Sequence, residues 1–456
     1  MDGSAATPTV TQRDQWMVEH QVFQIYDLFA SLPRNAKSAM LELQRDNHME
    51  YLTKGLKRLD PSFSVLDANR PWICYWILHA IALLGERVEP ELEDNVIEFL
   101  SRCQDPNGGY AGGPGQMPHL ATTYAAVNAL ITVGGERSLS SINREKLYTF
   151  LQRMKQPSGA FRMHDAGEID VRACYTAISV ASVLNILDNE LVRNVGDYIV
   201  SCQTYEGGIA GEPGAEAHGG YTFCGFATMI LISEVNRLDL AGLLNWVAFR
   251  QSRECGFQGR TNKLVDSCYS FWQGGVFALL QRVHSILDEE LGNLHSGGDC
   301  TNDPQQTGMT SDIPKGEEGS GGTLSQVDET CHSRLGGLNA SSPLNLNSIG
   351  YSFIKQPAEE EPLFHSLALQ QYILLCAQVM EGGLRDKPGK PRDYYHTCYS
   401  LSGLSVCQYS ESPDEDSPPL PSAVMGPYSN LLERIHPLFN VVVERYYEAH
   451  EFFATF

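Results

Sequence analysis

The sequence predicts an all-α protein built from repeated helical hairpins, and three observations support this prediction. Apolar residues recur with the period of a helix in stretches such as 96–100 and 175–184, and no stretch shows the alternation of a half-buried strand. A glycine-containing turn follows such a stretch at five places. Four of these turns reach Gly109, Ala160, Gly208 and Gly256, and this nearly even spacing is the signature of a structural repeat.

Each turn begins near a glutamine and contains a glycine, which supplies the positive φ that ends a helix. The glutamines are Gln104, Gln156, Gln203, Gln251 and Gln378. The fifth turn reaches Gly383, much further along the chain, and leaving out segment 288–361 restores the period. Helical hairpins stack into an open solenoid or close into a ring, and the repeat alone leaves both open.

Four regions follow from this pattern. We expect an N-terminal helical extension over 1–65, a first repeat region over 66–287, an insertion over 288–361 and a last repeat region over 362–456. The insertion has thirteen Asp/Glu against three Lys/Arg, close to half of the net charge of −22, and its composition predicts disorder. The last region contains an acidic loop at 410–422 and a C-terminal helix. Both acidic segments are interpreted as solvated loops, with docking or regulation as the alternative.

Composition excludes several classes of function. The 456 residues include 33 Lys+Arg and 55 Asp+Glu, and this acidic balance argues against binding to nucleic acid. The longest apolar run, 72–84, is shorter than the roughly 20 residues that a membrane span needs. The N-terminus shows no secretion signal, so the twelve cysteines indicate reduced thiols in a cytoplasmic protein.

The second helix of each repeat carries a tyrosine, and an ionisable residue recurs three positions before it. The tyrosines are Tyr124, Tyr175, Tyr221, Tyr269 and Tyr399. The residues three positions upstream are Ala121, Arg172, His218, Asp266 and His396. If the repeats are equivalent, these side chains converge at neighbouring helix N-termini, where free N–H groups and the helix dipole favour anions.

Two chemical groups stand out in this alignment. Asp266, Cys268 and His396 offer oxygen, sulfur and nitrogen, and three such ligands with an open fourth position are typical of a catalytic zinc site. The alternative is a buried cysteine beside a helix-capping aspartate. Arg260 and Lys263, with Arg172 and His218, would form a cationic group suited to a diphosphate, or else are ordinary surface cations.

Aromatic residues on the same helices are either hydrophobic core or the wall of a pocket for a long apolar ligand. They are Trp72, Trp76, Tyr221, Tyr269, Trp272, Tyr395 and Tyr399.

Six long motifs resemble the β subunits of the protein prenyltransferases, in their farnesyltransferase branch. They are RPWICYWILH (70–79) and segments 112–130, 168–177, 216–227, 256–275 and 383–404. The resemblance implies an α/α barrel (toroid), a ring of inner and outer helices around an apolar funnel. It also implies a heterodimer with a separate helical α subunit.

Site roles carried over from the family match the residues above. The resemblance implies zinc ligands at Asp266, Cys268 and His396, and Mg²⁺ at Asp386. It implies diphosphate contacts at His218, Arg260, Lys263 and Tyr269, and an isoprenoid wall at Arg172, Tyr175, Tyr221, Cys224 and Trp272. Peptide contacts are implied at Trp72, Trp76 and Tyr395.

The implied activity is that of the catalytic β subunit of a farnesyltransferase acting on proteins that end in a Cys-aliphatic-aliphatic-X (CaaX) box. The substrate sulfur would take the open zinc position as a thiolate and attack C1 of farnesyl diphosphate. Trp72 and Tyr399 would close the pocket floor and favour a 15-carbon chain. The alternatives are a type I geranylgeranyltransferase β subunit, a terpene or squalene-type cyclase, and a non-catalytic helical scaffold.

Overall fold

The computed structural model describes residues 7–283, 345–358, 363–412, 414 and 416–455, and it confirms the predicted all-α class. Strands are confined, in these ranges, to two short antiparallel pairs. β1 (Leu384–Arg385) pairs with β2 (Arg392–Asp393), and β3 (Ile435–His436) pairs with β4 (Val441–Val442). Every other described regular element is helical.

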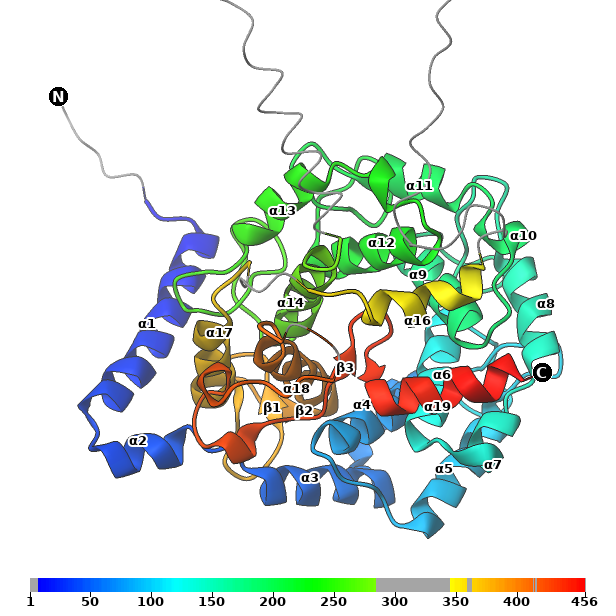
Figure 1. Ribbon diagram of the computed structural model, residues 1–456. Helices are drawn as coiled ribbons and strands as arrows, with labels where there is room; N and C mark the ends of the chain where they lie inside the picture. The colour runs from blue at the N-terminus through cyan, green and yellow to red at the C-terminus, as the bar shows by residue number, and fades with distance from the viewer. Residues whose placement is uncertain (1–6, 284–344, 359–362, 413, 415, 456) are drawn as a thin grey trace, which may run out of the picture.

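Six helical hairpins form a closed ring (Figure 1). The outer helices are α3 (Arg45–Lys57), α5 (Pro90–Cys103), α8 (Arg144–Met154), α11 (Val195–Cys202), α13 (Leu240–Ala248) and α17 (Ser366–Tyr372), which continues into η4 (Ile373–Ala377). The inner helices are α4 (Arg70–Leu83), α6 (Leu120–Val133), α9 (Val171–Val183), α12 (Gly219–Leu231), α14 (Tyr269–Leu280) and α18 (Tyr394–Gln408). Each inner helix packs on the next, and α18 returns to α4. The α/α barrel is therefore confirmed, and the open solenoid is excluded.

The turn glycines explain why successive hairpins pack so closely. Gly108 has φ +93°, and a Cβ built on it would lie 1.9 Å from the Lys146 carbonyl oxygen on the next outer helix. Gly382 has φ +90°, and its Cβ would lie 2.0 Å from the carbonyl oxygen of Asn47 on α3. Only a residue without a side chain fits such a position. The contact of Gly382 with α3 joins the last hairpin to the first.

The hairpin α3–α4 has no counterpart among the five predicted turns. Its two helices are joined by the 3₁₀ segment η1 (Pro61–Asn69) in place of a glycine turn. Because α3 is an outer helix of the ring, the extension outside the barrel consists of α1 (Val10–Ser31) and α2 (Arg34–Met40) rather than all of 1–65. The Tyr26 hydroxyl on α1 donates to the Glu254 carbonyl oxygen at 2.8 Å.

In four of the five turns a glutamine ties its repeat to the next one. The Gln203 side chain donates to the carbonyl oxygen of Asp239 and accepts from its N–H, both at 2.9 Å. In the second repeat Lys155 holds this place, and its Nζ donates to the Leu191 carbonyl oxygen at 2.8 Å. The prediction of Gln156 as the equivalent residue is therefore wrong by one position.

The predicted insertion is partly structured. Residues 345–358 include η3 (Leu346–Ser348) and α16 (Ile349–Ile354), and α16 packs on α12. This part differs from the expected disorder because its apolar residues Phe353 and Ile354 are buried. Residues 288–344 and 359–361 of the predicted insertion lie outside the described residues.

The remaining elements are short, apart from the C-terminal helix. They are α7 (Gly135–Ser140), α10 (Asn189–Val192), η2 (Val235–Arg237), η5 (Pro421–Ala423), η6 (Tyr428–Asn430) and α19 (Val443–Ala454). The acidic loop 410–422 contains only the start of η5 as regular structure among its described residues. No helix in the described ranges has the length and apolar character needed to cross a bilayer.

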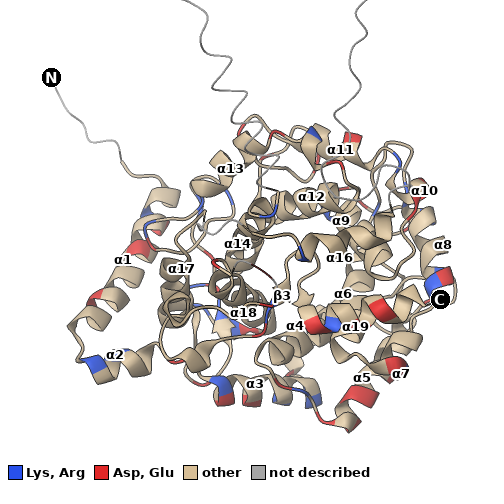
Figure 2. Ribbon diagram, in the orientation of Figure 1, with Lys and Arg blue, Asp and Glu red and all other residues tan. Residues whose placement is uncertain are grey.

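The inner helices carry almost no charge, and most charged residues lie on outer helices and loops (Figure 2).

The two ends of the barrel differ. The C-terminal hairpin, residues 435–442, covers the end where the inner helices finish: His79 Nε2, late in α4, lies 3.1 Å from Asn440 Oδ1. We call the opposite end, where the inner helices begin, the mouth.

Candidate active site

A polar side chain stands at an equivalent position at the start of each inner helix after α4. These residues are His119, Asp170, His218 and Asp393, which are the N-caps of α6, α9, α12 and α18, and Asp266, which lies in the turn that leads into α14. Each accepts a hydrogen bond from a backbone N–H two or three residues further on, which satisfies a donor that the helix leaves unpaired. Of the residues predicted at the recurring ionisable position, His218 and Asp266 stand here.

The tyrosine alignment is in the wrong register. Asp266 has Asp393 as its equivalent in the next repeat, and His396 lies three residues further along α18. Arg172 likewise lies two residues after its capping residue, Asp170. The predicted ligands still meet, because α14 and α18 are neighbours in the ring and both helices begin at the mouth.

Asp266, Cys268 and His396 form a compact group of potential metal ligands. A carboxylate oxygen, the Cys268 Sγ and an imidazole nitrogen lie within 4.8 Å of one another. His396 Nε2 is 3.2 Å from Asp266 Oδ1, and Cys268 is 3% exposed. The structure thus brings together three residues from two repeats that the insertion separates in the sequence.

Hydrogen bonds fix which nitrogen of His396 faces this group. Nδ1 lies 2.6 Å from Asp393 Oδ2, so Nδ1 carries a proton, and Nε2 is the nitrogen that faces Asp266. Burial lowers the pKa of His396, but hydrogen bonds to Asp266 and Asp393 outweigh it and raise the pKa to about 10. Burial and the nearby Asp266 raise the pKa of the Cys268 thiol. A metal ion that binds here would therefore replace one proton on His396 and one on Cys268.

A second group, His119, His164 and Glu168, also lies within 4.8 Å but has a different chemistry. His119 Nδ1 accepts from the Ala121 N–H at 3.0 Å, so a neutral ring carries its proton on Nε2. That nitrogen is then a hydrogen-bond donor and has no lone pair for a metal. The helix cap thus distinguishes His119 from His396.

His218 has the same orientation as His119. Its Nδ1 accepts from the Gly220 N–H at 3.0 Å, and its Nε2 lies 3.1 Å from the Tyr269 hydroxyl. Burial and the positive charge of Arg260 lower the pKa of His218 to about 4, so the ring is neutral at pH 7. The His218 Nε2–H therefore donates to the Tyr269 oxygen, which leaves the Tyr269 O–H as a hydrogen-bond donor at the mouth.

Cations surround this pair. Arg260 Nη1 lies 3.0 Å from Glu216 Oε2, and the Arg260 side chain is 40% exposed. Arg172 Nη2 lies 2.6 Å from Asp170 Oδ2, and its guanidinium stands 5.5 Å from the centre of the Tyr221 ring. The hydrogen bond to Asp170 raises the pKa of Arg172. The predicted cationic residues Arg260 and Arg172 thus flank His218, and Lys263 follows Arg260 on an exposed loop.

Below the mouth, eight aromatic rings form a closed circuit to which every inner helix contributes. In order, they are Trp72, Trp76, Tyr395, Tyr399, Trp272, Phe223, Tyr175 and Tyr124, with centroids of neighbours 4.6 to 5.7 Å apart. Trp72, Trp76, Trp272 and Tyr395 are only partly buried although they lie on inner helices, so they face the open axis of the barrel. Cys224 is buried on α12, beside the circuit residue Phe223.

Asp386 reaches the metal-ligand group from the loop between β1 and β2. Its carbonyl oxygen accepts from the Ser267 N–H at 2.9 Å, which anchors the loop beside Asp266. Burial and the negative charge of Asp266 raise the pKa of the Asp386 carboxyl. Lys387, which is buried, forms an ion pair with the same carboxylate.

Sequence reasoning missed Asp393 and His119. Both precede an inner helix directly and could have been found as capping residues, because Asp is a preferred N-cap and both stand where the extended chain enters the helix.

Residues 43–441 match the prenyltransferase alpha-alpha toroid domain, the class that the closed barrel defines. The protein farnesyltransferase subunit beta of Pisum sativum is 65% identical over 98% of this chain and 97% of the relative. That of Arabidopsis thaliana is 56% identical over 98% of this chain and 90% of the relative. The structure of Candida albicans protein geranylgeranyltransferase-I complexed with GGPP aligns with a TM-score of 0.61 at 18% identity, over 90% of this chain and 99% of that one, and so shares the fold. The chain belongs to the prenyltransferase family, among the protein farnesyltransferase β subunits.

Proposed function

We propose that this chain is a catalytic β subunit that works in the cytoplasm as a heterodimer with a helical α subunit. It transfers the farnesyl group of farnesyl diphosphate to the cysteine thiol of a CaaX box. The observation that carries the proposal is the placement of Asp266, Cys268 and His396 at the mouth, between hydrogen-bond donors for an anion and the aromatic circuit. Each of the three substrate parts, thiol, diphosphate and lipid, has its matching surface there.

The donor set fits a zinc ion. Asp266, Cys268 and His396 supply one oxygen, one sulfur and one nitrogen, and Asp393 orients His396 as a metal-ligating histidine requires. When bound, zinc would supply Lewis acidity that lowers the pKa of a coordinated thiol. Asp386, beside Asp266, would hold Mg²⁺ with the diphosphate, since carboxylate and phosphate oxygens are the ligands Mg²⁺ prefers.

The chain's own residues bind and stabilise the leaving group. His218 and Tyr269 contact the diphosphate, with the Tyr269 hydroxyl as the hydrogen-bond donor that His218 orients, and Arg260 and Lys263 add positive charge. As the sulfur–C1 bond forms and the C1–oxygen bond breaks, negative charge grows on the diphosphate, where these groups are already in place. Preorganised donors of this kind cost no rearrangement during the reaction.

The aromatic circuit binds the lipid and keeps water from the reacting carbon. Arg172, Tyr175, Tyr221, Cys224 and Trp272 form the isoprenoid wall, and Trp72, Trp76 and Tyr395 pack against the aliphatic residues of the peptide. Trp72 and Tyr399 limit the space below the farnesyl chain. We therefore expect Trp72→Thr with Tyr399→Phe to shift the preference towards the 20-carbon geranylgeranyl chain, measured as the ratio of kcat/KM for the two diphosphates. A type I geranylgeranyltransferase would show almost no change.

The test combines metal content with activity. The chain is co-expressed with an α subunit, zinc is measured by atomic absorption, and farnesyl transfer to a CaaX peptide is followed. Wild type should hold one zinc per heterodimer, and Cys268→Ala and His396→Ala should lose both zinc and activity. Cys202→Ala, on the outer helix α11, is the matched control and should keep both. If Cys268→Ala and His396→Ala both transfer farnesyl as well as wild type, the proposed catalytic role of the Asp266–Cys268–His396 group is wrong.

A further inference from the structure

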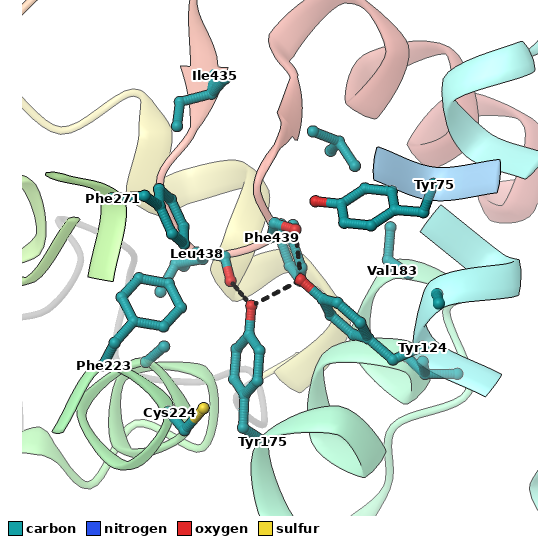
Figure 3. Close-up of a cluster of buried hydrophobic side chains, with 14 of the residues drawn as sticks. Tyr75, Tyr124, Tyr175, Val183, Phe223, Cys224, Phe271, Ile435, Leu438 and Phe439 are labelled. Atoms are coloured by element: carbon teal, nitrogen blue, oxygen red, sulfur yellow. Dashed lines mark hydrogen bonds between the residues drawn. The ribbon is translucent and has the colours of Figure 1, made fainter. Parts of the chain in front are cut away.

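Three tyrosines on consecutive inner helices donate to three consecutive carbonyl groups of the C-terminal hairpin. The Tyr75 hydroxyl on α4 lies 2.6 Å from the Asn440 oxygen. The Tyr124 hydroxyl on α6 lies 3.0 Å from the Phe439 oxygen, and the Tyr175 hydroxyl on α9 lies 2.8 Å from the Leu438 oxygen. Figure 3 shows Tyr124 and Tyr175 converging on the hairpin, with their hydroxyls 3.3 Å apart.

The hairpin itself is held from the other side. His436 Nε2 lies 3.0 Å from the Gly350 carbonyl oxygen on α16, and the Phe439 ring stacks on Tyr446 of α19 with centroids 5.1 Å apart. On the side of the tyrosines, Asn128 of α6 adds a hydrogen bond from its amide to the Phe439 oxygen at 3.2 Å. The three carbonyl groups therefore occupy fixed positions at the covered end of the barrel.

Tyr124 and Tyr175 are also members of the aromatic circuit. The Tyr124 ring lies 5.7 Å from Trp72, and the Tyr175 ring lies 5.5 Å from Phe223. A hydroxyl fixed to the hairpin holds each ring in place, because tilting would break the buried hydrogen bond from Tyr124 to the Phe439 oxygen or from Tyr175 to the Leu438 oxygen. The positions of these two rings are thus coupled to the C-terminal hairpin.

We propose that the C-terminal hairpin is a determinant of isoprenoid length, with Tyr124 and Tyr175 as positioning residues that it holds across the barrel. This rests on the proposed function and extends it, since it adds a segment remote from the mouth to the residues that choose between 15-carbon and 20-carbon lipids. A loosened row of tyrosines makes room for one further isoprene unit.

The experiment uses the co-expressed heterodimer and measures kcat/KM for farnesyl and geranylgeranyl diphosphate with one CaaX peptide. The double variant Tyr124→Phe/Tyr175→Phe should raise the 20-carbon to 15-carbon ratio at least tenfold. Asn128→Leu loosens the hairpin without changing any circuit ring, and it should raise the ratio in the same direction. The control Tyr110→Phe removes a buried hydroxyl that has no hydrogen-bond partner among the described residues, and it should leave the ratio unchanged.

The outcomes separate the two proposals. Wild type that transfers farnesyl, with an unchanged ratio in the double variant and in Asn128→Leu, overturns the length determinant alone. Wild type that transfers no prenyl group overturns both. If the double variant does not fold, the ratio in Asn128→Leu decides.

Discussion

The affinity of the mouth for zinc should depend steeply on pH, because two of the three ligands are protonated in the metal-free protein. The pKa of His396 is raised to about 10 by its hydrogen bonds to Asp266 and Asp393, which outweigh its burial. Burial raises the pKa of the Cys268 thiol, whereas hydrogen bonds and charge from His396 outweigh burial and lower the pKa of Asp266. Between pH 6.5 and 8.5, zinc binding should therefore release two protons, one from His396 and one from Cys268.

The number of protons released sets how steeply the affinity for zinc changes with pH. Two protons per ion mean that the apparent association constant rises about a hundredfold per pH unit, or about 2.7 kcal/mol at about 1.36 kcal/mol per decade. The assay is chelator competition on the zinc-depleted heterodimer at several pH values. Calorimetry in two buffers of different ionisation enthalpy counts the protons independently.

A matched pair of variants checks the assignment of the two protons. Asp393→Asn keeps a good helix cap but removes one of the charges that raise the pKa of His396, so the proton release should fall below two at pH 8.5. Asp239→Asn changes the cap of the outer helix α13 and should leave the release at two. A release of one proton in wild type would show that His396 is neutral before the metal binds and would refute the reasoning.

Two further predictions concern the ring. Gly382→Ala should lower Tm by more than Gly389→Ala, because both have positive φ but only the Gly382 Cβ would meet a backbone atom, the Asn47 oxygen at 2.0 Å; equal shifts in a thermal melt would contradict this. Burial lowers the pKa of Lys155 to about 8, so between pH 8 and about 10.4 this group binds more protons in the unfolded chain, and its own contribution to the free energy of unfolding rises with pH. Lys155→Gln, which restores the residue of the other repeats, should remove that contribution, so the difference in unfolding free energy between wild type and variant should rise with pH over this range in urea titrations. A difference that does not change with pH would contradict this assignment.

The repeat architecture could be predicted from the sequence because its signals are local. A glycine such as Gly108 or Gly382 is required by its positive φ and by a backbone atom where its side chain would stand. The hairpin α3–α4 was missed because η1 joins its helices without such a glycine. Ring closure was expected only from the family resemblance, since the contact between α18 and α4 depends on packing over the whole chain.

The site was predicted in composition but not in register. Asp266, Cys268 and His396 were found by donor chemistry, and the structure brings them together. Alignment on the tyrosines failed because they lie at different distances from the starts of their helices, whereas a capping residue is fixed by the first backbone N–H groups of the helix. Asp393, which orients His396, was overlooked for this reason.

Ring closure also sets an order of events for a chain emerging from the ribosome. Asn47 on α3 contacts Gly382, although most of the chain lies between them. One side of α4 is covered only when α18 packs on it. Closing such a long loop costs conformational entropy, and the contacts that offset this cost form only when the last hairpin is present. Asp266 meets His396 only through α18, the last inner helix, so a nascent chain that stops short of α18 lacks one of the three potential metal ligands. The Asp266–Cys268–His396 group is therefore complete only in a chain whose ring has closed.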